Sequence, residues 1–333
     1  MKDLVVYKLR FSTPVHISTQ SGVGYEETEE VIHSDTLFSA LMTVWNSIYD
    51  DNVANICETP PFHISSAFPF KEEIYFFPRP MIRIGKEGEE DLNTGKKLKK
   101  VKFISKDLFE SVLQGIVPEF EEGATIQEGK FWLKKNIGRQ QTCRIFEERE
   151  SPRVVIDRLT NASEIFYFSK IIFEKDAGLF FLVRFIDKTM KRKFETVLRY
   201  LGDEGLGSDK RSGKGLYSLD IDDDFKLSVP QYADSFLTLS LYCPKEREFN
   251  GGIRENASYN LISRKGWIHS TDAMALRRKE VRMFVEGSVF NAIGGEVYGH
   301  NRCVLKKDEA LGLKHNVYRY GIAFDLPLLR RQG

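Results

Sequence analysis

Cysteine is scarce in this chain of 333 residues, which has only four. They are widely spaced, and no two of them form a Cys-x-x-Cys pair: Cys57, Cys143, Cys243 and Cys303. Structural zinc sites and disulfide frameworks both need cysteines at characteristic spacings. The sequence therefore predicts neither, and we expect no metal and no bound cofactor. A reducing cytoplasm is the simplest compartment for such a chain.

Long apolar runs and an excess of one charge are also missing. No uninterrupted apolar run approaches about 18 residues, the length that suggests a membrane span. The first stretch, Met1–Phe11, alternates and carries charge, which is typical of a strand rather than of a signal peptide. We therefore expect neither export nor a membrane partner. The formal net charge is only +1, so any surface that binds nucleic acid must be local.

By contrast, four glycines stand in pairs at the two ends of one loop, residues 205–215, with basic residues among them. Glycine adopts positive φ and lets another backbone come close, and successive exposed N–H groups in such a loop bind anions. The loop follows an amphipathic helix predicted over 189–201 and precedes a strand predicted over 216–221. It is predicted to hold a phosphate group. Its candidate residues are Gly205, Gly207, Lys210, Arg211, Ser212, Gly213, Lys214 and Gly215.

This loop matches neither of the two familiar phosphate-binding loops. A P-loop has four residues between its first glycine and its Gly-Lys pair, whereas five separate Gly207 from Gly213 here. A dinucleotide fingerprint opens a helix after a strand, whereas this loop follows a helix. The alternative is a glycine-rich surface hairpin or helix C-cap that holds no ligand.

The N-terminal part of the chain has the pattern of a strand, a helix and two more strands. Residues 4–11 alternate as in a strand, and Ser34 is predicted to cap a helix over 35–49. Apolar residues recur in this helix at spacings of three and four, which indicates one buried face. Two short aromatic strands closed by prolines follow at 62–70 and 74–77.

A large insertion is predicted within this first unit. A split strand–helix–strand–strand–helix–strand unit needs the helix and strand that flank the glycine loop, so residues 78–187 are the insert. Its arginines are interleaved with Phe131, Trp132 and Phe146. Arginine with aromatic side chains suits phosphates and unstacked bases, although an ordinary charged hairpin is the alternative. The arginines that we single out are Arg139, Arg144, Arg153 and Arg158.

The C-terminal third repeats the mixed pattern of strands. A new alternating strand begins at 235–243 after a polar stretch, which places a domain boundary near Pro230. We therefore predict an α+β fold with tandem ferredoxin-like domains, a connectivity shared with RNA-binding RRM domains. The first domain would span 1–230 with its insert, and the second 231–333.

Several motifs taken together resemble the RAMP superfamily of CRISPR proteins. They are Ile32–Leu41, Leu201–Leu216, Phe77–Pro80, Arg153–Arg158 and Gly287–Phe290. Within the superfamily the chain is similar to the fourth Csm subunit of type III-A effector complexes, in the Cas-five-like group. The resemblance covers nearly the whole chain.

This resemblance implies a subunit that caps one end of the complex in antiviral defence and holds the repeat-derived 5′ handle of the guide RNA. Its implied partners are that RNA, the large polymerase-like subunit with an HD domain, and the first backbone RAMP subunit. The glycine loop would match the family's glycine-rich loop. The helix start, Ser34, Asp35 and Thr36, would approach the RNA backbone, and the arginine-bearing insert would match a thumb-like hairpin that props the guide.

An enzyme is the main alternative, and it rests on histidine. Relatives that process the precursor guide commonly cut with a histidine, and His16 or His33 would supply general acid–base action near the expected RNA face. Each is isolated in sequence, and no catalytic motif stands out. We therefore predict a non-catalytic subunit in which His16 contacts RNA. The alternatives are a metal-independent endoribonuclease and a structural scaffold without major RNA contacts.

Overall fold

The computed structural model describes residues 4–18, 26–82, 92–121, 123–134, 144–268, 276–294 and 297–330. The helices in these ranges are α1 (Ser34–Ile48), α2 (Val53–Glu58), α3 (Leu92–Lys100), α4 (Lys106–Leu113), α5 (Lys191–Glu204) and α6 (Glu246–Asn250). Within the same ranges, no helix is long and apolar enough to cross a membrane.

One large sheet organises the first two thirds of the chain. Its strands are β1 (Val5–Phe11), β2 (Phe62–Ile64), β3 (Phe68–Lys71), β4 (Ile74–Pro78), β5 (Phe103–Ser105), β6 (Thr125–Ile126), β7 (Phe131–Trp132), β10 (Ala177–Phe185) and β11 (Tyr217–Asp222). They lie in the order β11-β1-β10-β3-β4-β5-β7-β6, and β2 also pairs with β10. All pairs are antiparallel except β5 with β7.

The expected ferredoxin-like unit is present at one end of this sheet. It consists of β1, α1, the β2 and β3 segments, β10, α5 and β11, with β1 and β10 in the centre. The prediction of the third strand was wrong, because β10 and not residues 74–77 holds that place. Every residue from Ala177 to Val183 is buried, since β10 pairs on both edges and is covered on both faces. The insert therefore ends before β10 and not at residue 187.

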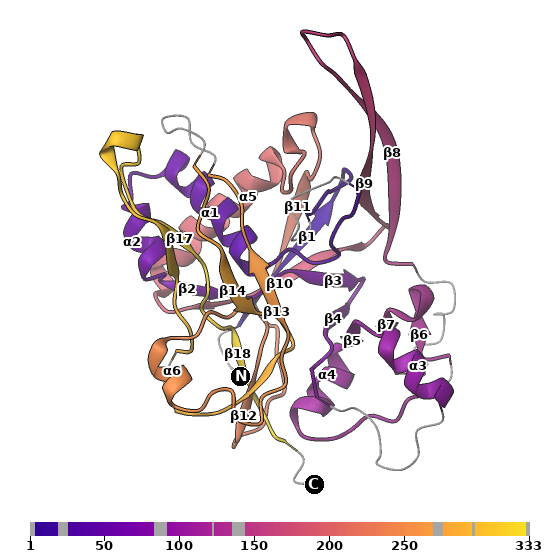
Figure 1. The fold of residues 1–333 in the computed structure, drawn as a ribbon. Coiled ribbons are helices and arrows are strands. Elements are labelled where there is room, and N and C mark those ends of the chain that lie inside the picture. Colours follow the sequence, from indigo (N-terminus) through magenta and orange to yellow (C-terminus); the bar gives the residue numbers. More distant parts are fainter. Residues whose placement is uncertain are drawn as a thin grey trace.

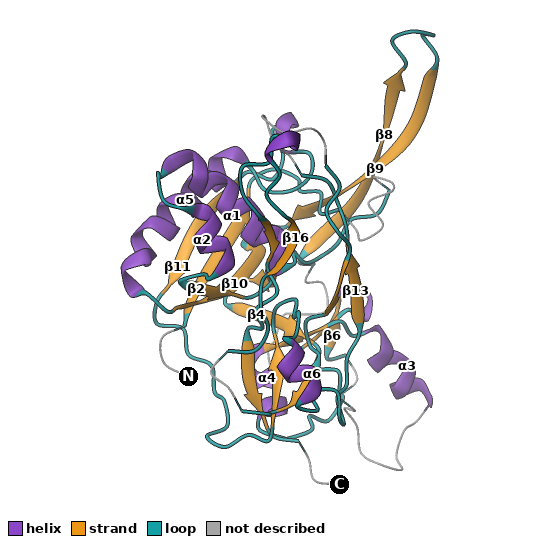
Figure 2. Cartoon of the chain, turned by 60° about the vertical axis from the view of Figure 1, so that its left-hand side comes forward, coloured by secondary structure: helices purple, strands orange, loops and turns teal. Residues whose placement is uncertain are grey.

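Helices α1 and α5 cover one face of this unit, together with α2 (Figure 2). The predicted apolar stripes are confirmed, because Leu37, Leu41, Val44 and Trp45 of α1 and Phe194, Val197, Leu198 and Leu201 of α5 are buried. Full burial of each such side chain contributes about 1.5–3 kcal/mol. Helix α1 begins one residue earlier than predicted, at Ser34, and its N-cap residue is His33.

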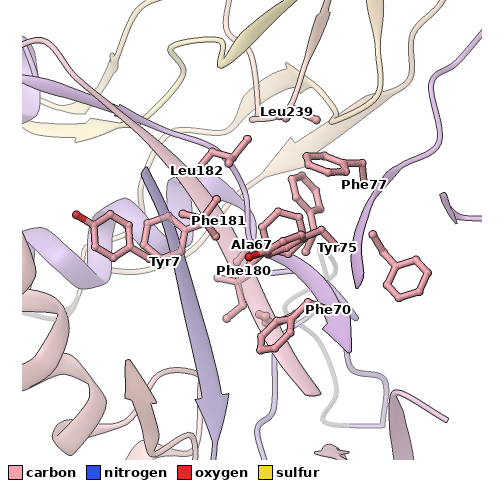
Figure 3. Close-up of a cluster of buried hydrophobic side chains, with 14 of the residues drawn as sticks. Tyr7, Ala67, Phe70, Tyr75, Phe77, Phe180, Phe181, Leu182 and Leu239 are labelled. Carbon is pink, nitrogen blue, oxygen red and sulfur yellow. The ribbon is translucent and has the colours of Figure 1, made fainter. Parts of the chain in front are cut away.

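The core is strongly aromatic and is shared between the two parts of the chain. Figure 3 shows Phe77, Phe180 and Tyr75 packed together, with Leu239 from the C-terminal part beside them. Phe180 makes edge contacts with Phe77 and Tyr75 at ring-centroid distances of 5.3 and 4.8 Å. The backbone N–H of Ser66 also donates to the carbonyl oxygen of Leu239 at 2.9 Å. Because one core spans both parts, they support each other's folding.

The most prominent feature of the insert is a long antiparallel hairpin that projects from the body (Figure 1). It consists of β8 (Phe146–Ile156) and β9 (Ser163–Phe173), each of 11 residues. The inner half of β9 is buried or half-buried, whereas most of β8 and the outer half of β9 are exposed. The insert also contains α3, whose last turn carries Lys97, Lys99 and Lys100.

The C-terminal part repeats the strand order of the first unit with little helix. Its strands are β12 (Ser235–Thr238), β13 (Leu261–Arg264), β14 (Val281–Phe284), β15 (Val289–Asn291), β16 (Arg302–Leu305), β17 (Val317–Arg319) and β18 (Asp325–Leu328). Strand β12 lies between β15 and β18, and Ser258 bridges to Val289 on the far edge of β15. The predicted fold class, α+β with tandem ferredoxin-like units, is confirmed.

Candidate nucleic-acid interface

The glycines of the 205–215 loop all have positive φ, and three of them lie against the chain's own backbone. A Cβ on Gly215 would lie 1.9 Å from the carbonyl oxygen of Leu206. On Gly205 and Gly207 it would lie 2.4 and 2.6 Å from the carbonyl oxygens of Lys214 and His16. The sequence correctly indicated a close backbone approach. The approaching backbone, however, is the protein's own, and only a Cβ on Gly213 would meet nothing within 4 Å.

The basic residues of this loop differ in how they are held. Lys210 pairs with Glu204 at 3.1 Å, and Lys214 pairs with Asp209 at 2.6 Å. Arg211 is exposed and pairs with no acidic residue in the described part of the chain. The hydroxyl of Ser212 donates to the backbone oxygen of Asp209 at 2.9 Å. Arg211 is therefore the loop cation that is most available to a ligand.

Asp209 joins the loop to strand β8 of the projecting hairpin. Its carboxylate accepts from Arg153 of β8 at 2.6 Å and from Lys214 at the same distance. Burial opposes ionisation, but the hydrogen bonds from Arg153 and Lys214 outweigh it and hold the pKa of Asp209 well below its usual range. Asp209 was not among the site residues predicted from the sequence. Its signal was a single acidic residue among basic ones.

An aromatic ring supports the same cations. The Arg153 guanidinium lies 3.9 Å from the centroid of the Phe168 ring, and the Lys214 ammonium lies 4.5 Å from it. Cation–π contacts of this kind favour a fixed position for both charges. The His16 ring packs on Phe168 at 4.6 Å. The glycine loop, the middle of the hairpin and the segment after β1 therefore meet at one place.

His16 packs against Phe168 and is buried rather than exposed at the surface. It is 1% exposed, and its Nδ1 donates to the carbonyl oxygen of Ser169 at 2.7 Å. Burial lowers the pKa of His16, so the ring is neutral at physiological pH. The prediction that His16 contacts RNA directly does not agree with this burial.

The other arginines of the insert fall at different places. Arg144 is exposed just before β8, and Arg158 is exposed in the turn of the hairpin. Arg139 lies outside the described residues. The outer parts of β8 and β9 and the turn between them also carry exposed apolar side chains, which were not predicted from the sequence. The large exposed side chains there are Val154, Val155, Ile156, Leu159, Ile165 and Tyr167.

The start of α1 is buried between the two parts of the chain, contrary to expectation. Ser34 is 0% exposed, and its hydroxyl accepts from the backbone N–H of Leu241 at 3.0 Å. Asp35 accepts from two nitrogens of Arg264 at 3.0 Å each, and also from Arg319. Ser34 and Asp35 therefore lie at an internal junction between the two parts of the chain and not on an RNA-facing surface. Thr36 is exposed, and its hydroxyl accepts from Arg264 at 2.7 Å.

Charges at this junction are balanced by distant residues. Burial raises the pKa of Asp35, but Arg264 and Arg319 outweigh it and hold the pKa far below its usual range. Nothing in the local sequence indicates these partners, because 229 and 284 residues separate them from Asp35.

His33 is held between two carboxylates at the same junction. Its Nδ1 lies 2.8 Å from Glu286, and its Nε2 lies 3.0 Å from Glu29. Burial lowers the pKa of His33, but Glu286 and Glu29 raise it more, to about 10. Both ring nitrogens therefore carry a proton and donate. A histidine in this state has no free nitrogen to act as a general base.

Metal-binding clusters are not found in the ranges that the structure describes, where no three His, Cys, Asp or Glu side chains could hold an ion together. Cys57, Cys243 and Cys303 are free thiols.

Comparison with known families identifies the class of protein. The family model of the RAMP superfamily matches residues 8–218, and the chain belongs to this superfamily. A second model, the CRISPR Csm4 C-terminal domain, matches residues 231–328. The resemblance drawn from the sequence motifs is thereby confirmed.

Individual relatives agree with both matches. The chain is 26% identical over 316 residues to CRISPR system Cms protein Csm4 of Thermococcus onnurineus, covering 91% of this chain and 94% of the relative. It is 22% identical to the Csm4 protein of Methanocaldococcus jannaschii, covering 86% and 85%. A solved Csm3–Csm4 subcomplex of the type III-A interference complex contains a chain that matches with a TM-score of 0.64 at 17% identity, covering 98% and 99%. A solved Csm1–Csm4 cassette in complex with cA4 contains one with a TM-score of 0.63 at 20% identity, covering 99% of each chain.

Proposed function

We propose that this chain is the Csm4-type subunit of a type III-A CRISPR effector complex and that it binds the repeat-derived 5′ handle of the guide RNA without cutting it. The observation that carries this proposal is the meeting of the glycine loop and strand β8 of the hairpin at Asp209. Arg153, Lys214 and the exposed Arg211 thereby gather positive charge on one side of the molecule. A local cluster of this kind suits a phosphate backbone in a chain whose total charge is close to zero.

The partners proposed for this chain follow its relatives. Csm4 chains have been solved with Csm1 and with Csm3. By analogy, this chain would contact a large polymerase-like subunit with an HD domain on one side and a backbone RAMP subunit on the other, in the cytoplasm. The exposed apolar side chains near the hairpin turn, together with Arg158, would prop the guide RNA next to the backbone subunit.

Removal of two loop cations is expected to weaken RNA binding. The double variant Lys210→Ala, Arg211→Ala should bind a single-stranded RNA that carries the handle about tenfold more weakly. Each exposed charge pair contributes up to about 1 kcal/mol, and a loss of about 1.4 kcal/mol corresponds to a tenfold lower affinity. The slope of log affinity against log salt should fall by about 0.7 for each phosphate that the variant no longer neutralises. Fluorescence anisotropy across a salt series measures both quantities.

The matched control is Lys191→Ala, Arg192→Ala, which removes the same residue types at the opposite end of α5. It should leave the affinity nearly unchanged. Equal affinities for wild type and both double variants would count against an RNA contact by this loop.

Catalysis is not expected at this site. His16 is buried and neutral, and His33 is doubly hydrogen-bonded between carboxylates. Incubation of repeat RNA with the purified chain in EDTA should therefore leave the RNA intact on a denaturing gel. A discrete cut that disappears in His16→Ala or His33→Ala would support the endoribonuclease instead. A complex that keeps its RNA when this subunit is omitted would support the scaffold.

A further inference from the structure

We propose that Arg153 and Lys214 form a phosphate-binding position that the Asp209 carboxylate occupies in this structure, and that a phosphodiester of the bound RNA displaces this carboxylate. The inference rests on the proposed function, since it concerns how the same surface takes RNA. In this inference the Asp209 carboxylate competes with the RNA phosphate for the same two cations.

The geometry at Asp209 is that of an anion site. An arginine from the hairpin and a lysine from the loop converge on one carboxylate, each at 2.6 Å. Phe168 holds both cations from below at 3.9 and 4.5 Å. A phosphodiester carries the same single charge as a carboxylate and also offers two oxygens, so it fits the same pair of donors. The position is preformed for such a ligand.

The position can also be reached from solvent. The side chain of Arg153 is 33% exposed, and those of Lys214 and Asp209 are 18% exposed each. Arg211 and Ser212, which follow Asp209 in the loop, are exposed beside it. Gly213 has no atom within 4 Å of a Cβ position, so a ligand backbone has room to approach there.

Protonation does not release the two cations. The pKa of Asp209 lies well below its usual range, so the carboxylate stays charged at every physiological pH. Only another anion can take its place. Displacement lowers the observed affinity for every ligand, which favours an RNA with further contacts along the loop and hairpin over isolated phosphates.

The test replaces the competitor without changing its size. Asp209→Asn removes the charge that opposes phosphate, so the full-length chain should bind handle-carrying RNA about tenfold more tightly at the same salt concentration. The control is Asp223→Asn. Asp223 also pairs with a lysine at 2.6 Å, but its partner Lys191 is at the far end of α5, about 20 Å away. This control has the same net charge and should change affinity by less than about twofold.

The tighter RNA binding of Asp209→Asn should depend on Arg153 and Lys214. In the triple variant Asp209→Asn, Arg153→Ala, Lys214→Ala, it should disappear, and the salt slope should fall by about 0.7 for each phosphate that is no longer neutralised. If Asp209 only positions the cations, Asp209→Asn will bind RNA no better than wild type or more weakly, and the inference is overturned.

Two further outcomes are separable. If Asp209→Asn melts below the assay temperature, Lys214→Gln in the otherwise wild-type chain takes its place. This variant should weaken RNA binding, whereas unchanged affinity would contradict a phosphate contact by Lys214. If neither wild type nor Asp209→Asn binds RNA at any salt concentration, the proposed function itself fails. Wild-type binding without tighter binding by Asp209→Asn overturns the competitor alone.

Discussion

Replacement of Asp35 by alanine is expected to lower the free energy of unfolding by about 3–5 kcal/mol, because it removes one partner of a buried ion pair. The side chain of Asp35 is 1% exposed, and those of its partners Arg264 and Arg319 are 11% and 4% exposed. Without the carboxylate, two guanidinium groups would remain close together with little solvent. Urea unfolding followed by tryptophan fluorescence measures the change.

Glu29 and Glu286 also stabilise the charged form of Arg264, but among the described residues Asp35 is the carboxylate to which Arg264 and Arg319 donate hydrogen bonds. Nε of Arg319 is already buried without a hydrogen-bond partner among the described residues. Arg278 lies close enough to repel Arg319 and Arg264, and burial, Arg319 and Arg264 each lower the pKa of Arg278. The Asp35 carboxylate is thus the anion that lets these arginines pack at the start of α1.

The matched control for this prediction is Asp223→Ala. Asp223 pairs with Lys191 at 2.6 Å, but its side chain is 57% exposed. Loss of such a surface pair costs about 1 kcal/mol or less. A similar small loss for Asp35→Ala would contradict the interpretation of the α1 start as a buried electrostatic junction.

The periodic elements of this fold could be predicted from the sequence, because their signals are local. The stripes of α1 and α5 follow from residues three and four apart, and β1 follows from simple alternation. The apolar run of β10 likewise predicted a strand. Its place in the sheet could not be predicted, because pairing with β1 and β3 depends on contacts across more than 100 residues.

The candidate site was predictable only in part, for a similar reason. Residue types near the loop correctly indicated cations next to glycines. Which cations are held by acidic partners depends on the fold, since Arg153 and Asp209 are 56 residues apart. The α1 start shows the opposite error. Its polar residues suggested a ligand surface, yet Arg264 and Arg319 come from strands that the local sequence cannot place beside it.

A substitution in the glycine loop is expected to have the second large effect on stability. Gly215→Ala is expected to destabilise the chain by about 2–5 kcal/mol, since left-handed backbone costs about 1–2 kcal/mol and an overpacked contact about 1–3 kcal/mol. Gly215 has φ 75°, and its Cβ would lie 1.9, 2.8 and 2.9 Å from three backbone atoms of Leu206. Two hydrogen bonds of 2.9 Å, from Gly215 to Pro14 and from Leu206 to Gly215, would be strained as well.

Gly213→Ala is the control that separates backbone strain from close packing. Gly213 has φ 72°, almost the same as Gly215, but nothing lies within 4 Å of its Cβ position. Gly213→Ala should therefore lower the free energy of unfolding only by the cost of left-handed backbone, about 1–2 kcal/mol. Urea unfolding compares the two variants, and equal losses would mean that the packing against Leu206 relaxes without consequence. If Gly215→Ala also weakens RNA binding at a temperature where it is folded, the close packing of Leu206 and Gly215 is what holds Asp209 and Arg211 in position.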